Sequence, residues 1–289
     1  MTQPAIAHSP APADDYLDAV IRAALIEDLG DGDVTTLNTI PAEAAFTGDF
    51  LAKEAGVIAG LQVARRVFAL LDPAVAFRPL VADGDRAKPG DIIAAVTGPG
   101  RAILSGERSA LNFLQRMSGI ATATRRYVDA VAGAHAIILD TRKTVPGLRL
   151  LDKWAVRLGG GRNHRTGLFD MALIKDNHIA AVGSITEAVR RVRAGDPRGR
   201  PIEVEVTNLA QLCEALALPI ERIMLDNMNL EQMRVAVETV AGKIPLEASG
   251  GVNLQTVAAI AATGVDFISV GALTHSVKAL DISLDLRAS

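Results

Sequence analysis

Basic side chains follow two short apolar segments in the middle of the sequence. Arg142 and Lys143 come shortly after residues 137–139, and Lys175 comes directly after residues 172–174. A short apolar run that is followed by polar residues is typical of a buried strand. Arginine and lysine bind carboxylates and phosphates through charge-assisted hydrogen bonds. Cations at the ends of these strands therefore indicate a site for a small anion.

The charge of this region supports the same interpretation. Residues 141–175 contain eight basic and two acidic residues, a net charge of +6, whereas the whole chain carries −3 and the remainder therefore −9. A basic region within an acidic chain favours a bound anion. A solvated helix face is the alternative, and we expect it for Arg149, Lys153 and Arg157.

Acidic residues stand at the ends of two further strands. Glu205 lies near the end of residues 202–206, and Asp226 directly follows residues 223–225. Two carboxylates there can hold Mg²⁺ directly or through water, or accept hydrogen bonds from ribose hydroxyls. Because strand residues alternate, Glu203 and Glu205 are expected on one face, inside a barrel, where buried acids need basic partners. A structural ion pair is the alternative for these acids.

Two glycine-containing loops come late in the chain. Residues 249–251, Ser-Gly-Gly, precede a helix expected to begin at Asn253, and Gly271 and Ala272 follow the apolar run 267–270. Such loops in a βα-barrel commonly bind phosphate through backbone N–H groups and a helix N-terminus. The alternative is that these loops bind nothing and contain glycine only because the turn requires a positive φ angle. Together with the basic strand ends, the loops favour a phosphorylated ligand.

A third glycine-rich segment carries a histidine. His164 and Arg165 follow three glycines at 159–161, which we expect to form a mobile loop. Within this basic loop His164 is a candidate ligand residue. No Ser-His-Asp or Cys-His arrangement with a supporting sequence context is evident, so the sequence gives no sign of a side-chain nucleophile.

Strands and helices alternate in the second half of the chain. The polar residues at successive strand ends recur at intervals of 21 to 22 residues, which implies parallel strands with right-handed crossovers. Six strands favour a barrel or partial barrel. A doubly wound open sheet is the alternative, although no G-x-G-x-x-G motif follows an early strand. The expected strands are 137–139, 172–174, 202–206, 223–225, 244–246 and 267–270, with helices beginning at Ser184, Asn208, Asn229 and Asn253.

The first half reads as a separate α+β unit. An amphipathic helix is expected from Asp14 or Asp15 to Leu29, and another at about residues 61–71. A long helix is expected to begin after Ser105 and to run over residues 106–132. Strands are expected near 46–53, 75–80 and 92–96.

Composition restricts the protein class. With 49% hydrophobic and 22% charged residues the chain is expected to fold as a globular protein, and its near-neutral charge argues against nucleic-acid binding. The single cysteine, Cys213, excludes an intramolecular disulfide and a thiolate metal cluster, which favours the cytoplasm, and we expect it to be buried. Residues 1–13 are expected to form a disordered tail. No targeting segment or membrane span is recognisable.

Eight motifs together resemble one enzyme family, quinolinate phosphoribosyltransferase. The resemblance covers about residues 14–287, and the segments DTRKT, NHR and KDNH occur in the family's order and spacing. They are Glu107-Arg108, DTRKTVPGLR at 140–149, GGGRNHR at 159–165, ALIKDNHI at 172–179, EVEV at 203–206, LDN at 225–227, ASGG at 248–251 and VGALTHS at 270–276.

The resemblance implies a fold of two domains and an assembly. An N-terminal α/β sandwich is expected over residues 14–117, completed by residues 280–289, and an open α/β barrel of about seven strands over residues 118–279. A homodimer is implied, with a higher oligomer left open, in which Arg108 of the partner subunit completes each active site.

The resemblance also implies the reaction and the roles of residues. Quinolinate and 5-phosphoribosyl-1-pyrophosphate would react with Mg²⁺ to give nicotinate mononucleotide, pyrophosphate and CO₂. The implied quinolinate contacts are Arg108 of the partner subunit, Thr141, Arg142, His164, Arg165 and Lys175. The implied contacts to the phosphoribosyl donor are Lys143, Glu205, Asp226, Ser249, Gly250, Gly251, Val270, Gly271, Ala272 and His275. Lys143, Lys175, Glu205 and Asp226 are the implied catalytic residues, the two acids holding Mg²⁺ indirectly.

Three alternatives remain at this point. A paralogue with the same fold could act on another aromatic acid. A non-catalytic protein could bind a phosphoribosyl metabolite without turnover. A generic phosphate-binding barrel isomerase or lyase would leave the arginine cluster unexplained.

Overall fold

The computed structural model describes residues 10–288, so most of the expected tail, residues 1–9, lies outside the described part. The chain forms two compact units. Within the described residues, the first combines residues 10–125, 145–160 and 276–288, and the second combines residues 126–144 and 161–275. Segment 145–160 thus packs with the first unit, although its sequence position falls inside the range expected for the barrel.

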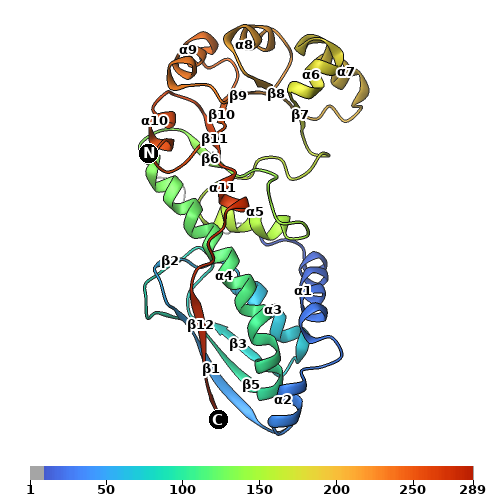
Figure 1. Cartoon of the computed structure of the whole chain (residues 1–289), viewed down its shortest axis with the longest axis vertical. Helices are drawn as coiled ribbons and strands as arrows, with labels where there is room; N and C mark the ends of the chain where they lie inside the picture. The colour runs from blue at the N-terminus through green and yellow to red at the C-terminus, as the bar shows by residue number, and fades with distance from the viewer. Residues whose placement is uncertain (1–9, 289) are drawn as a thin grey trace. The chain divides into compact units, whose positions relative to one another are not determined.

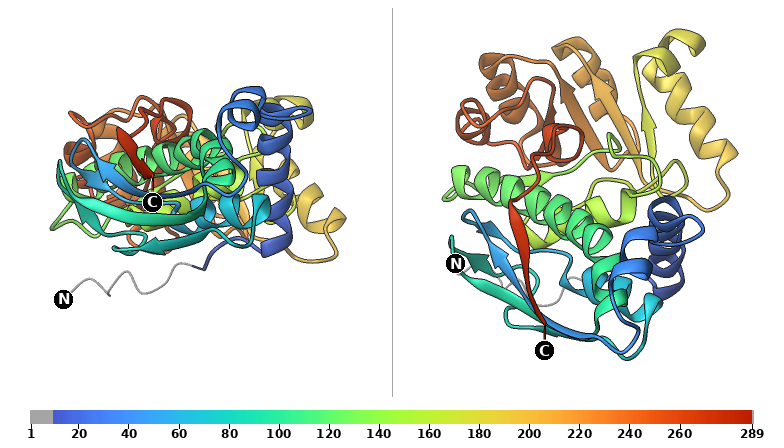
Figure 2. Two further views of the ribbon diagram at one scale, coloured as in Figure 1. Left: turned by 90° about the horizontal axis from the view of Figure 1, so that it is seen from below. Right: turned by 60° about the horizontal axis from the view of Figure 1, so that its bottom comes forward.

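A four-stranded antiparallel sheet forms the centre of the first unit (Figure 1). Its strand order is β12-β1-β5-β3, with a separate pair β2-β4. The last strand of the chain therefore pairs with the first, and Figure 2 shows the two running side by side. The strands are β1 (Ala45–Ala52), β2 (Gly56–Val57), β3 (Ala76–Pro79), β4 (Arg86–Ala87), β5 (Ile92–Pro99) and β12 (Ile282–Ala288).

Helices bury the apolar face of this unit. Phe50, Phe68 and Phe77 form an aromatic cluster with ring centroids 5.4 to 6.2 Å apart. Such ring pairs stabilise a core beyond the area they bury. The helices are α1 (Asp14–Leu29), α2 (Val34–Thr39), α3 (Leu61–Leu71), α4 (Gly100–Ala130), whose residues up to Arg125 belong to this unit, and α5 (Arg149–Leu158).

A six-stranded parallel sheet forms the second unit, in the order β6-β11-β10-β9-β8-β7. Beyond β6 the segment at Arg162 forms an isolated parallel bridge with Leu139, so it acts as a short seventh element next to the six strands of the described chain. This confirms the open α/β barrel. The strands are β6 (Ile137–Leu139), β7 (Ala172–Ile174), β8 (Ile202–Val206), β9 (Arg222–Asp226), β10 (Leu246–Ser249) and β11 (Phe267–Ser269).

Local capping explains where the barrel helices begin. Ser184, Asn208 and Asn229 each accept a hydrogen bond from the backbone N–H three residues later, as their positions predict. Figure 1 shows these helices along the outer side of the sheet. The barrel helices are α6 (Asp176–Val182), α7 (Ile185–Gly195), α8 (Leu209–Leu216), α9 (Leu230–Val240), α10 (Val257–Ala261) and α11 (Ala272–His275).

Several element boundaries differ from the sequence-based expectation. Helix α4 begins at Gly100, so Ser105 lies within it and does not cap it; its hydroxyl donates to Asp33 at 2.9 Å. Helix α1 begins without a side-chain cap at Ala13. Asn253 does not begin a helix, since its side chain closes a turn that ends at Thr256, the N-cap of α10.

Two single-residue expectations were also wrong. Lys153 is 2% exposed, because α5 turns it into the first unit rather than towards solvent. Cys213 is exposed, because the buried face of α8 is formed by Leu212 and Ala215 instead. Over residues 10–288, no helix combines the length and the apolar character that crossing a bilayer requires.

Candidate active site

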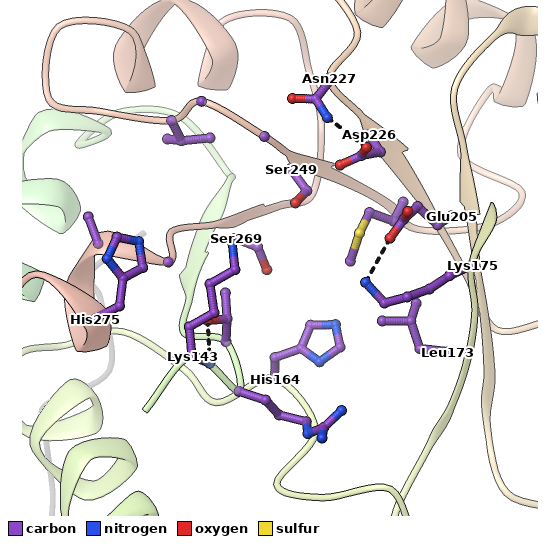
Figure 3. A pocket seen from close by; sticks show the side chains of 18 of the residues that line it. Lys143, His164, Leu173, Lys175, Glu205, Asp226, Asn227, Ser249, Ser269 and His275 are labelled. Carbon is purple, nitrogen blue, oxygen red and sulfur yellow. Dashed lines mark hydrogen bonds and ion pairs between the residues drawn. The ribbon is translucent and has the colours of Figure 1, made fainter. Parts of the chain in front are cut away.

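A pocket of about 810 Å³ opens at the carboxyl ends of the barrel strands, entirely within the second unit. Figure 3 shows Lys143 and His275 on one side of it, Lys175 and Glu205 on the other, and His164 at its floor. Four cations, two carboxylates and two glycine loops line the same cavity. Its volume lies in the range of small-molecule sites.

Two arginines of the pocket lie close enough for their charges to repel one another. Burial lowers the pKa of Arg165 first of all, and the charge of Arg142 lowers it further. The Nε of Arg142 is buried and has no hydrogen-bond partner among the described residues, while Arg165 donates from Nη1 to the carbonyl of Met171 at 3.2 Å. A bound anion would satisfy the buried donor and remove the repulsion.

Backbone contacts set the position of Lys143. The Thr274 hydroxyl donates to the Lys143 carbonyl at 2.8 Å, and the Lys143 N–H donates to the Thr141 hydroxyl at 3.1 Å. A Cβ added at Gly271 would lie 3.2 Å from Cδ of Lys143, so the glycine lets the lysine pass close to the loop. The ammonium group thereby reaches the pocket beside the glycine loops.

Lys175 is held at the point where β7 turns into α6. The ring Nδ1 of His178 accepts the backbone N–H of Lys175 at 3.0 Å, which explains the histidine in the Lys-Asp-Asn-His motif. The Lys175 Nζ then donates to Oε2 of Glu205 at 3.1 Å. This ion pair joins the basic and the acidic sides of the pocket.

The acids Glu205 and Asp226 fit an indirectly held magnesium ion. Asn227 donates to Oδ2 of Asp226 at 2.7 Å, and Lys175 uses Oε2 of Glu205. One oxygen of each carboxylate thus remains available to a ligand. Mg²⁺ binds six oxygen ligands, so these two carboxylate oxygens are too few to hold it alone. Ribose hydroxyls, phosphate oxygens and water would have to supply the other ligands.

The loop at Gly250 depends on glycine. Its φ is +97°, and an added Cβ would lie 2.1 Å from Oδ1 of Asn227. Gly250→Ala is expected to displace Asn227 from Asp226 and to strain the backbone, lowering stability by about 1–3 kcal/mol and weakening the binding of ribose 5-phosphate. Titration calorimetry with ribose 5-phosphate measures the binding.

Gly242→Ala is the matched control for this prediction. Gly242 also has a positive φ, +73°, but nothing lies within 4 Å of an added Cβ, and it does not line the pocket. It should lose stability and bind ribose 5-phosphate normally. Equal binding by both variants would show that the Gly250 loop does not hold the anion.

A buried cluster of one histidine and two glutamates lies beside the pocket floor. His164 Nε2 is 2.8 Å from Oε2 of Glu203 and 3.5 Å from Oε2 of Glu247, and both glutamates are fully buried. Arg222 donates to Glu247 at 2.9 Å, and the Ser269 hydroxyl donates to the same carboxylate. The sequence predicts a strand that ends at residue 246, with Glu247 directly after it. In the structure β10 begins at Leu246, so Glu247 lies within the strand and its side chain points into the barrel.

By type and spacing these three residues could bind a metal ion. Two observations oppose it. The Nδ1 of His164 accepts the N–H of Arg165 at 2.7 Å, so the neutral ring carries its hydrogen on Nε2, the atom that would have to ligate. Arg222 already occupies the Glu247 oxygen that faces His164. The geometry therefore favours a buried cluster of charged and polar side chains over a metal centre.

Burial controls the ionisation of these glutamates. It raises the pKa of Glu247 to about 7, and the neighbouring Glu203 adds to the rise; burial likewise raises the pKa of Glu203 to about 7. Their pKa in the folded state thus exceeds the unfolded value, so the folded state binds protons more tightly. The free energy of unfolding should fall as pH rises from about 4.5 through about 7.

Glu247→Gln tests this pH dependence. The variant lacks one of the titrating carboxyls, so its stability relative to the parent protein should increase by about 1–3 kcal/mol between pH 5 and pH 8. Urea unfolding at the two pH values measures the difference. Glu238→Gln, which alters an exposed acid, should show no such change. A constant difference for Glu247→Gln contradicts the prediction.

The structure brings most of the predicted site residues together. The pocket contains Thr141, Arg142, Lys143, His164, Arg165, Lys175, Glu205, Asp226, Ser249, Gly250, Gly251, Gly271, Ala272 and His275. Val270 does not line it: the side chain is buried and the N–H donates to the Leu139 carbonyl at 2.9 Å. Arg108 does not line it either and is exposed on α4.

Sequence reasoning did not single out five lining residues. Leu173, Met224 and Ser269 point inward through strand alternation, which a correct strand register could have shown. Asn227 follows Asp226 in the quoted Leu-Asp-Asn motif and has φ +54°, which asparagine tolerates better than most residues. The fifth is Val252, for which the sequence carries no evident signal.

Comparisons with known proteins agree with this geometry. Residues 120–285 match the family model "Quinolinate phosphoribosyl transferase, C-terminal domain", and residues 33–118 match the corresponding N-terminal domain. A Mycobacterium leprae nicotinate-nucleotide pyrophosphorylase [carboxylating] is 52% identical over 92% of this chain and 95% of its own length. A chloroplastic enzyme of that name from Oryza sativa is 48% identical over 93% and 77%.

A solved structure gives the same result. NadC from Streptococcus pyogenes superposes with a TM-score of 0.94 at 43% identity, covering 97% of this chain and all of that one. The resemblance drawn from the eight motifs is thereby confirmed. The chain belongs to the quinolinate phosphoribosyl transferase family.

Proposed function

We propose that the protein converts quinolinate and 5-phosphoribosyl-1-pyrophosphate to nicotinate mononucleotide, pyrophosphate and CO₂, the decarboxylating step of de novo NAD synthesis. The observation that carries this proposal is one pocket holding two arginines, two lysines, two acids and two glycine loops. That combination suits a dicarboxylate and a phosphorylated sugar together. Names of relatives at 47–52% identity support it.

The basic floor of the pocket suits quinolinate, a dianion with adjacent carboxylates. Guanidinium groups bind carboxylates in a bidentate manner. The buried Nε–H of Arg142 can donate to a carboxylate, and Arg165 lies close enough to Arg142 for the two positive charges to repel. We assign the carboxylates to these two arginines, assisted by Lys175 and the Thr141 hydroxyl.

The glycine side suits the phosphoribosyl donor. Ser249, the loop at residues 250–251 and the Gly271-Ala272 turn would hold the 5-phosphate together with His275, and Lys143 the pyrophosphate. Glu205 and Asp226 would bind the ribose hydroxyls and, through them, Mg²⁺. When bound, Mg²⁺ would neutralise charge on the pyrophosphate. Loss of turnover on chelation, restored by added Mg²⁺, is the measurement for this assignment.

The residues of the pocket act by positioning and electrostatics. The sugar becomes oxocarbenium-like as its bond to pyrophosphate breaks, and Lys143 stabilises the departing negative charge while the acids favour the positive ring. The quinolinate nitrogen then bonds to C1′ and becomes a pyridinium. This accepts the electron pair of the C2–carboxylate bond, CO₂ leaves, and C2 takes up a proton. A side-chain nucleophile is not required.

Arg108 belongs to the proposal as a residue supplied in trans. It is exposed on α4 and belongs to the first unit, whereas the pocket is formed by the second. We propose a homodimer in which Arg108 of the partner subunit reaches the quinolinate. Mixing Arg108→Ala subunits with Lys143→Ala subunits should restore part of the activity, because each mixed dimer has one intact site.

We also place the protein in the cytoplasm, because a chain with a single cysteine cannot form an intramolecular disulfide and so does not need an oxidising compartment.

Turnover is the direct test. Purified protein is mixed with the phosphoribosyl donor, Mg²⁺ and either quinolinate or nicotinate, and mononucleotide and CO₂ are followed by chromatography and label release. Product from quinolinate alone supports the proposal. Turnover of another aromatic acid alone would favour a paralogue, and binding of the donor without product would favour a non-catalytic protein.

A further inference from the structure

Both ring nitrogens of His164 lie beside protein groups. Nδ1 accepts the backbone N–H of Arg165 at 2.7 Å, and Nε2 lies 2.8 Å from Oε2 of Glu203. The backbone N–H of His164 donates to Asp140 at 2.9 Å. His164 thus lines the cavity with Nδ1 hydrogen-bonded to the main chain and Nε2 close to Glu203, although the Nε2 contact is not aligned as a hydrogen bond.

Glu203 depends on this histidine. Its side chain is fully buried, and neither carboxylate oxygen has an aligned hydrogen-bond donor among the described residues. A buried carboxyl group without a donor is costly. The Nε2 hydrogen of His164, 2.8 Å away, is the donor that a small ring movement brings into line.

Glu247 completes the support from the other side. Its carboxylate lies 3.5 Å from His164 Nε2 and is itself held by Arg222 and the Ser269 hydroxyl. Arg222 is in turn fixed, with its guanidinium carbon 4.3 Å from the ring centre of Phe267. The His164 ring is therefore placed against a rigid part of the barrel interior.

We propose that Glu203 is a positioning residue for Arg165. Glu203 fixes the His164 ring through Nε2, and Nδ1 of the same ring fixes the main chain at Arg165. The Arg165 guanidinium therefore stays directed at the substrate carboxylates. This inference rests on the proposed function for the identity of the substrate. It gives His164 the support of Arg165 as a further role, beside the contact with quinolinate that the motif resemblance implies.

Kinetics of three variants test the proposal. Glu203→Ala removes the support and should raise the KM for quinolinate about tenfold or more, while the KM for the phosphoribosyl donor stays within about twofold. Glu203→Gln keeps an acceptor oxygen and should restore the quinolinate KM to within about threefold of the parent. Should Glu203→Ala not fold, Glu203→Met fills the space and gives the same comparison.

Val204→Ala is the matched control. Val204 lies on the same strand, is fully buried and, by alternation, faces away from Glu203, so its truncation lowers stability without touching His164. It should leave both KM values unchanged. If the quinolinate KM rises equally in Val204→Ala and Glu203→Ala, the rise is explained by lost stability alone and the proposal is overturned.

Nitrogen NMR gives a readout that does not need turnover. The chain has five histidines, and His164→Asn identifies the signal of His164. In the parent and in Glu203→Gln, Nδ1 should be unprotonated and Nε2 protonated; in Glu203→Ala the Nε2–H signal should shift or exchange rapidly. An unchanged signal in Glu203→Ala overturns the positioning role. A parent protein that shows the expected signal but does not turn over quinolinate would overturn the proposed function alone.

Discussion

Lys143→Ala is expected to lower kcat by about 10²- to 10³-fold, the usual loss when a group that stabilises developing charge is removed. The negative charge on pyrophosphate grows as its bond to the sugar breaks, so the ammonium group binds the transition state more strongly than the bound donor. The KM for the donor should change much less than kcat. Steady-state kinetics with varied donor at saturating quinolinate measures both constants.

The fold should survive this substitution. Lys143 is exposed, and its position is set by backbone contacts with Thr274 and Thr141 that alanine retains. Thermal unfolding should therefore match the parent protein, and Lys243→Ala, at an exposed site outside the pocket, should retain full activity. An unchanged kcat in folded Lys143→Ala would remove the lysine from the reaction.

Arg165→Lys should raise the KM for quinolinate by about 10- to 100-fold although the positive charge is kept. Lysine loses the bidentate geometry that matches a carboxylate, and hydrogen bonds to charged groups contribute about 1.5–3 kcal/mol each. Lysine also loses the contact of Nη1 with the Met171 carbonyl that orients the side chain. Isothermal titration with quinolinate gives the affinity without turnover.

Arg162→Lys provides the control for this change. Arg162 lies three residues earlier in the same segment, is exposed and does not line the pocket. Its substitution should leave quinolinate affinity unchanged. If Arg165→Lys binds quinolinate as the parent does, charge alone suffices, and the forked carboxylate contact must come from Arg142 or Arg108 of the partner subunit.

The residues at strand ends could be predicted because their signals are local. Apolar runs mark the strands, and Ser184, Asn208 and Asn229 mark the helices that follow, so Lys175, Glu205 and Asp226 are placed by their neighbours in sequence. The site follows from these positions, since parallel strands bring their carboxyl ends to one edge.

Contacts between distant segments could not be predicted in this way. Equal spacing suggested that Glu205, Asp226 and Glu247 occupy equivalent positions, but Glu205 and Glu247 both pair with Met224, whereas Asp226 pairs with Ser249, two residues further along each strand. Although Glu247 is level with Glu205 in the pairing, its carboxylate lies within 4.8 Å of that of Glu203 in the barrel interior. The partner of these acids, Arg222, begins a strand, and nothing local distinguishes it from a surface arginine. Likewise, the orientation of the His164 ring depends on residues of four strands, β8 to β11, so it cannot be derived from the sequence of its own loop.

The pairing of β12 with β1 has a consequence for biosynthesis. β1 leaves the ribosome early, yet the strand that covers its edge, residues 282–288, is translated only after all six barrel strands. An open strand edge is a template for association with other chains. The nascent protein must therefore carry an exposed edge until translation is nearly finished, and a chain that stops before residue 282 keeps it. Such truncated chains should require chaperones or aggregate, even where the barrel itself has folded.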